Sequence, residues 1–141
     1  MRILHLLALA SFAVFSAHDV RAESKTVSLG EVSVVGRSDG VLNPKIVSLT
    51  EDELGRLDLS GARRQAILSL SVTQLDTQAR PGGASSICVV SLALRNPRSG
   101  AIFAVVEGRA RAEGAQRLPL ESSVLRGAVH GAVARIPDAL R

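Results

Sequence analysis

Cys88, the one cysteine, and His130, the one histidine after residue 22, are the residues from which a thiol–imidazole nucleophile would have to be built in that part of the sequence. Cys88 lies in the apolar run Ile87–Val90, where a free cysteine usually behaves as a small buried hydrophobe. His130 lies on the polar side of a segment with helical periodicity. Because burial in apolar surroundings raises the pKa of a thiol and lowers its reactivity, the sequence predicts a structural role for Cys88.

Other reaction centres lack the residues that they need. A serine–histidine–carboxylate triad would also have to use His130, and the sequence has no Gly-x-Ser-x-Gly turn. A zinc site needs three or four ligands, which one cysteine and one histidine do not supply. The acidic residues Glu51, Asp52, Glu53 and Asp58 lack the alternating spacing of a calcium-binding loop. The glycines match neither a phosphate-binding loop nor a dinucleotide fingerprint. We therefore expect a non-enzyme without cofactor or metal.

The first 22 residues have the three-part pattern of a bacterial secretory signal peptide. Arg2 supplies the positive start, Ile3–Ala17 is an apolar run, and Val20–Ala22 offers short side chains to a signal peptidase. We expect cleavage after Ala22, which leaves one small domain over residues 23–141; the alternative is an uncleaved N-terminal anchor. No later segment approaches the length of a membrane span. With no lipid-acceptor cysteine after the apolar run, the sequence predicts a periplasmic or secreted protein.

The composition of this predicted mature chain weighs against nucleic-acid binding. Cleavage would leave 119 residues, and the 17 basic and 13 acidic residues would become 15 and 12, a scattered net charge of +3. Phe103 would be the one aromatic residue, which gives no stacking platform for bases. Arg63–Arg64 is too short to form a basic patch. A core built from Val, Leu, Ile and Ala is still large enough for one modest domain.

The first half of the predicted domain shows strand and helix signals close together. A change of phase at Gly30–Glu31 indicates a β-bulge in the first strand. Thr50 and Glu53 have the spacing of a capping box, in which the threonine would begin a helix. The predicted elements are a strand over Lys25–Val35, a loop over Gly36–Pro44, a short strand over Lys45–Leu49 and a short helix over Glu51–Leu57.

The second half predicts strands joined by short turns. Pro97 and Gly100 suit a tight turn between two strands, and a flexible turn is expected at Arg80–Gly83. The expected strands are Ala66–Asp76, a central Ile87–Arg95, and Ala101–Arg111, with Ile102, Ala104, Val106 and Ala110 pointing inward.

A last helix is predicted from Pro119 to Pro137. Gly127 and Gly131 within it predict a close approach to a sheet or a partner helix. Its apolar stripe consists of Val124, Ala128, Ala132 and Ile136, widened by Leu125, Val129 and Val133. The predicted fold class is α+β, with a mainly antiparallel sheet of four to five strands and the C-terminal helix packed on one face.

Residues 66–112 resemble part of a known pattern. The strand Ala66–Leu75, the turn sequence Asn96–Gly100 and the segment Val106–Ala110 are similar to the core of CsgG-like and LpoB-like bacterial envelope proteins. The resemblance implies a protein of the outer membrane region that assists assembly or activates a cell-wall synthase. Thr26–Gly36 also looks like the segment by which outer-membrane receptors engage the TonB protein, and Val47–Leu54 looks like part of the plug of those receptors.

Two functions of different classes follow from these patterns. The first is a periplasmic binding or adaptor module that recognises another envelope protein through a sheet edge near Thr26–Val35. The second is a small secreted enzyme or ligand carrier that uses the face around Arg126 and His130. A homodimer joined edge to edge is a third, purely structural alternative.

Overall fold

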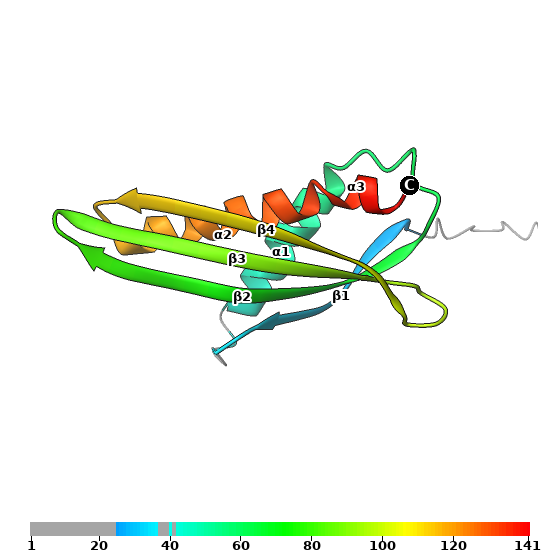
Figure 1. The fold of residues 1–141 in the computed structure, drawn as a ribbon, viewed down its shortest axis with the longest axis horizontal. Helices are drawn as coiled ribbons and strands as arrows, with labels where there is room; N and C mark the ends of the chain where they lie inside the picture. Colours follow the sequence, from blue (N-terminus) through cyan, green and yellow to red (C-terminus); the bar gives the residue numbers. More distant parts are fainter. Residues whose placement is uncertain (1–24, 37–39, 41) are drawn as a thin grey trace, which may run out of the picture.

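A computed structural model describes residues 25–36, 40 and 42–141 of the chain (Figure 1). The predicted signal peptide over residues 1–22 lies outside the described residues, and so do positions 37–39 and 41 of the predicted loop. The elements are β1 (Val27–Val34), α1 (Leu42–Gly55), β2 (Ala66–Arg80), β3 (Gly83–Arg95), β4 (Ile102–Gly114), α2 (Arg117–Val133) and α3 (Ile136–Ala139).

The four strands form one mixed sheet in the order β1-β2-β3-β4. β1 runs parallel to β2 because α1 carries the chain back between them, whereas β2, β3 and β4 form an antiparallel meander. Helix α2 packs on β3 and β4, and α1 packs on β1 and against α2. Both helices thus cover the same face of the sheet (Figure 1). The predicted α+β fold with a C-terminal helix on one face is confirmed.

The bulge and the two turns lie where the sequence predicts them. The pairing of β1 with β2 slips between Leu29 and Val32, so the Gly30–Glu31 bulge is confirmed. Gly82 and Gly100 have φ angles of 80° and 70°, a region that glycine enters without steric cost. In the second turn, Asn96 also accepts hydrogen bonds from two backbone N–H groups through its side-chain oxygen.

The predicted strand at Lys45–Leu49 and the predicted capping box are wrong. Helix α1 begins at Leu42, so Thr50 lies inside it and donates its hydroxyl proton to the Ile46 carbonyl oxygen at 2.7 Å. Ile46, Thr50 and Glu53 recur at helical spacing and form the buried side of α1. The helix therefore begins about two and a half turns ahead of the acidic residues that the sequence suggested as its start.

Ile102 does not point inward as predicted. The β3–β4 register shifts after the Leu94–Ala104 pair, so Ile102 lies opposite Arg95 and is 50% exposed. The extra residue, Phe103, moves Ile102 to the uncovered side of the sheet. Ala104, Val106 and Ala110 do pack against the core.

The ends of the last helix also differ from the prediction. Helix α2 begins at Arg117, two residues before Pro119, and ends at Val133. Pro137 lies in the first turn of the separate helix α3 and does not terminate a helix. A proline in a first turn interrupts no helical hydrogen bond, because the early N–H groups have no partner within the helix.

The core lies between the helices and the covered face of the sheet. Every residue of the predicted α2 stripe is buried. The helix and β4 come so close that a Cβ atom on Gly108 would overlap the carbonyl oxygen of Ala128. On the helix side, a Cβ on Gly127 would lie 3.0 Å from the Ala110 methyl carbon. The close approach predicted from Gly127 and Gly131 is therefore confirmed, and the partner is the sheet.

Candidate functional site

The free edge of β1 is the first candidate site, as the sequence predicts. No strand of the described chain pairs with β1 on the side away from β2. Leu29, Val32 and Val34 pack against the core, and Ser33 forms a hydroxyl–hydroxyl hydrogen bond with Ser71 of β2 at 2.9 Å. These four side chains of β1 are thus used within the fold. What the strand offers outward is its backbone.

The direction of these backbone groups follows from the hydrogen bonds at the two ends of β1. The Ala66 N–H donates to the Thr26 carbonyl oxygen, and the Val35 N–H donates to the Val72 carbonyl oxygen, both at 3.0 Å. Successive residues of a strand direct their backbone groups to opposite edges. Val34 therefore directs its N–H and C=O away from β2, where an extended peptide can pair with them.

A second candidate site lies along the line where α1 meets α2. Lys45 donates from Nζ to the Ser122 hydroxyl at 2.8 Å, and Glu53 Oε2 lies 2.8 Å from His130 Nδ1. Each bridge joins residues 77 positions apart, so the two helices run in the same direction. A hollow of about 610 Å³ lies beside this line, with Glu53, Arg126 and His130 in its wall.

The pairing with Glu53 orients the imidazole of His130 as a carboxylate orients a general base. Arg126 lies one helical turn before His130, and Ser123 lies two turns before it, about 10.5 Å along the axis. The Ser122 hydroxyl is engaged by Lys45. Within the described chain, neither serine is hydrogen-bonded to His130. Among the described residues, the hollow thus places an imidazole held by a carboxylate beside Arg126, with no serine hydroxyl bonded to that imidazole.

Glu53 is the site residue that sequence reasoning missed. Its side chain is only 9% exposed, and it contacts His130 and, at 3.4 Å, Arg56. The spacing of Thr50 and Glu53 predicts a capping box instead. The signal that identifies its true position is its spacing from Ile46 and Thr50, which places all three on one side of a longer helix.

Cys88 is fully buried in β3, as predicted. Burial raises the pKa of its thiol from 9.0 to about 11. His130, in contrast, is exposed and paired with Glu53, so the structure does not bring the two residues together as a dyad. The thiol acts as a small apolar side chain of the core.

We expect the native Cys88 thiol to resist alkylation. At pH 8 the raised pKa leaves about 100-fold less thiolate than in the unfolded chain. Because the folded state favours the thiol form, the free energy of unfolding should fall as pH rises from about 9 to about 11. Iodoacetamide labelling followed by mass spectrometry, and urea unfolding at several pH values beside Cys88→Ala, check both points. Fast labelling of the folded protein at pH 8 would refute this.

The acidic residues singled out in the sequence do not form a cation site. Glu51 and Asp52 are exposed on α1, while Glu53 faces His130. Hydrogen bonds from the side chain and backbone of Ser60 lower the pKa of Asp58. Within residues 25–36, 40 and 42–141, no three side chains of the metal-binding types come together.

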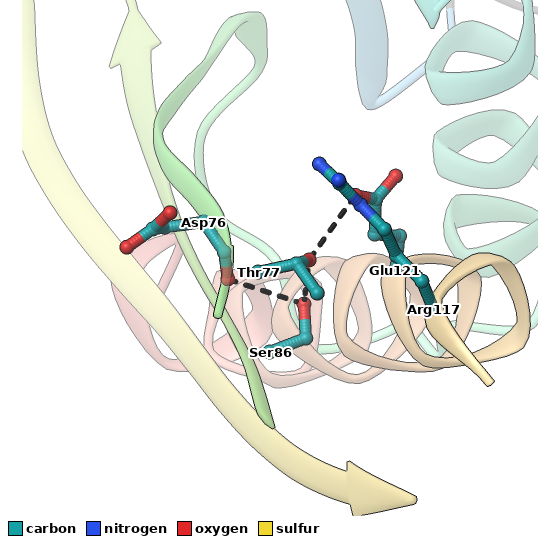
Figure 2. A network of polar contacts seen from close by, with 5 residues as sticks. All are labelled: Asp76, Thr77, Ser86, Arg117 and Glu121. Atoms are coloured by element: carbon teal, nitrogen blue, oxygen red, sulfur yellow. Dashed lines mark hydrogen bonds and ion pairs between the residues drawn. The ribbon is translucent and has the colours of Figure 1, made fainter. Parts of the chain in front are cut away.

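A polar network joins α2 to the β2–β3 hairpin (Figure 2). The Thr77 hydroxyl donates to Glu121 Oε1 at 3.1 Å and lies 2.9 Å from the Ser86 hydroxyl. Arg117 also contacts Glu121 Oε1 at 3.1 Å, one helical turn earlier. Ser86 donates to the carbonyl oxygen of Asp76. Each hydroxyl thus has a partner in the fold, so the network fixes the start of α2 on the hairpin.

No protein family model matches the chain, and no curated protein matches it. The fold is similar to PelC from Paraburkholderia phytofirmans, solved as a dodecamer, with 15% sequence identity and a TM-score of 0.49 over 79% of this chain and 88% of that chain. A candidate lipoprotein from Caulobacter crescentus has 14% identity and a TM-score of 0.48, covering 82% and 87% of the two chains. A lipoprotein from Neisseria meningitidis has 13% identity and a TM-score of 0.37, covering 67% and 91%.

These similarities concern the fold alone, so the resemblance of residues 66–112 to CsgG-like and LpoB-like proteins stays a prediction. Among the described helices, none has both the length and the apolar character needed to cross a bilayer.

Proposed function

We propose that this chain is a non-catalytic binding module of the bacterial cell envelope, which holds an extended segment of another envelope protein along β1. The observation that carries the proposal is the outward-facing backbone of β1, which pairs with β2 on one side only. Main-chain hydrogen bonds to such an edge supply affinity in strand addition. The signal-peptide pattern of residues 1–22 supports the compartment.

β1 suits this role better than β4, the strand at the other edge of the sheet. Four charged side chains alternate along β4, and all are exposed: Glu107, Arg109, Arg111 and Glu113. Charges of this kind protect an edge from pairing with another chain. Within β1, Glu31 is the one charged residue, and it lies at the bulge.

Val34→Pro tests the proposal directly. Proline removes the outward N–H of Val34 and is tolerated where that group faces away from the sheet. Val34→Ala is the matched control, because it loses the packing of the valine side chain and keeps the N–H. In-cell crosslinking of C-terminally tagged protein in the native host should recover one dominant envelope protein with the wild type and Val34→Ala. We expect the Val34→Pro recovery to fall at least about tenfold.

Circular dichroism and thermal unfolding of both variants establish that each is folded. Equal recovery of the partner with Val34→Pro would exclude the β1 edge as the binding site. Recovery of the chain itself would support the homodimer joined edge to edge.

The hollow beside His130 supports a second candidate function, a carrier of a small ligand or an enzyme. The observation that favours it is the imidazole held by Glu53 at 2.8 Å in the wall of that hollow. His130→Ala distinguishes the two functions. Strand addition at β1 predicts unchanged partner recovery in this variant, whereas an activity that needs the imidazole would be lost while the fold is retained.

A further inference from the structure

Three arginines that are distant in the sequence line one hollow at the end of the sheet where β2 begins. Arg63 and Arg64 lie in the segment between α1 and β2, and Arg98 lies in the turn between β3 and β4. Ile67 pairs with Arg95, so these two segments reach the same end of the sheet (Figure 1). The hollow has a volume of about 460 Å³, and neither Asp nor Glu contributes to its wall.

Within the part of the chain that the structure describes, no carboxylate neutralises these arginines. None of the ion pairs among the described residues includes Arg63, Arg64 or Arg98. All three are exposed at the wall of the hollow, so their guanidinium groups are open to a ligand. Like charges collected in a concave surface raise the local concentration of counter-ions.

Two contacts give this hollow a defined shape. The Arg64 guanidinium lies over the ring of Phe103, 5.5 Å from the ring centre, which is a cation–π arrangement. Arg95 donates to the Ser69 hydroxyl at 3.2 Å and to the Gly100 carbonyl oxygen at 3.3 Å, and so ties the β3–β4 turn to β2. The ring positions the plane of one guanidinium, and Arg95 positions the turn that carries Arg98.

We propose that this hollow binds a phosphate group. A carboxylate offers two oxygen atoms and is satisfied by one forked guanidinium, whereas a phosphate offers more oxygens and up to two negative charges. Three guanidinium groups around one hollow match the phosphate better. The phosphate comes either from a free small molecule or from the headgroup of an anionic lipid. This site is separate from the β1 edge and does not depend on the function proposed there.

The experiment measures binding to the folded chain in two arms. One arm titrates pyrophosphate, followed by calorimetry and by amide chemical shifts, and the other measures sedimentation with vesicles that contain phosphatidylglycerol. The wild type should bind in one of the two arms. In that arm, the triple variant Arg63→Gln, Arg64→Gln, Arg98→Gln should bind at least about tenfold more weakly than the wild type. Arg109→Gln removes one exposed charge outside the hollow and should bind as the wild type does.

Phe103→Leu tests whether binding depends on the shape of the hollow or only on its positive charge. The substitution keeps the net charge and the apolar contact and removes the ring beneath Arg64. We expect binding to weaken about two- to fivefold. Circular dichroism establishes that the variants fold.

Pyrophosphate binding that depends on the three arginines supports a free phosphate compound, and vesicle binding with the same dependence supports a lipid headgroup. The proposal is overturned if the chain binds neither pyrophosphate at millimolar concentration nor the vesicles that contain phosphatidylglycerol. It is also overturned if each charge removed in the triple variant weakens binding no more than the single charge removed in Arg109→Gln.

Discussion

Gly108→Ala is expected to lower the free energy of unfolding by about 3 kcal/mol or to prevent folding. The added Cβ would overlap the Ala128 carbonyl oxygen and lie 2.5 Å from the backbone nitrogen of Ala132. Both atoms belong to the backbone of α2, so they cannot move away as a flexible side chain would. The helix would have to shift as a whole, and its packing on β3 and β4 would be loosened. Urea unfolding followed by circular dichroism measures the loss.

Gly131→Ala is the matched control on the other side of the same contact. A Cβ there would lie 3.8 Å from the Gly108 Cα atom, which is an ordinary van der Waals separation. Because alanine favours a helix interior over glycine, we expect Gly131→Ala to stabilise the protein by about 0.5–1 kcal/mol. Equal destabilisation by both substitutions would show that α2 packs on β4 in another register.

Leu92→Ala should cost about 2–5 kcal/mol of stability. Leu92 is fully buried at the centre of the sheet, opposite Leu70 on one side and Val106 on the other. Truncation would leave a cavity between the strands and α2, because neighbours on two strands hold it open. Urea unfolding checks the loss. A lower midpoint with an unchanged dependence of the free energy of unfolding on urea concentration shows that only stability has changed.

Ile102→Ala is the control for Leu92→Ala and tests the bulge at the same time. A side chain that is 50% exposed loses little burial on truncation, so we expect a cost below about 1 kcal/mol. A cost as large as that of Leu92→Ala would mean that Ile102 points inward, as the alternating pattern of the sequence suggests. The register shift after Leu94 would then be wrong.

The elements that the sequence predicts well are those in which local signals agree. The turn over Asn96–Gly100 combines a proline, a glycine at positive φ and an asparagine that bonds its own turn, so the hairpin around it is predictable. The apolar stripe of α2 is equally clear, because its residues recur every three to four positions.

The start of α1 was not predictable because two local patterns compete there. Thr50 followed by three acidic residues is typical of a helix start, yet a threonine inside a helix can also bond the carbonyl of the preceding turn. The structure has the second arrangement, from Thr50 to Ile46. Only the packing of α1 against β1 and α2 decides between the two.

The hollow lined by Arg63, Arg64 and Arg98 shows a different limit of sequence reasoning. Arg63–Arg64 is a single pair in the sequence, and Phe103 is isolated from other aromatic residues. Arg98 joins them only because the β3–β4 hairpin returns to the end of the sheet where β2 begins. A property that depends on the meeting of distant segments leaves no periodic signal in any one of them.

From the connection between β1 and β2 we infer an order in which the fold assembles. Strands β2, β3 and β4 are neighbours in sequence and close through short turns, so their pairing requires little loop closure. β1 meets β2 only after the whole of α1 has been placed between them. Contacts between distant segments form more slowly than local ones. We therefore expect β1 to join the sheet late and to be the strand that leaves first in local opening.

This order links the stability of the strand to whatever binds it. A segment that pairs with the outer edge of β1 binds only the state in which β1 is docked, so it suppresses opening in proportion to its occupancy. For a partner bound at β1 as proposed, partner binding and the docking of β1 form one coupled equilibrium, in which the partner stabilises the docked strand.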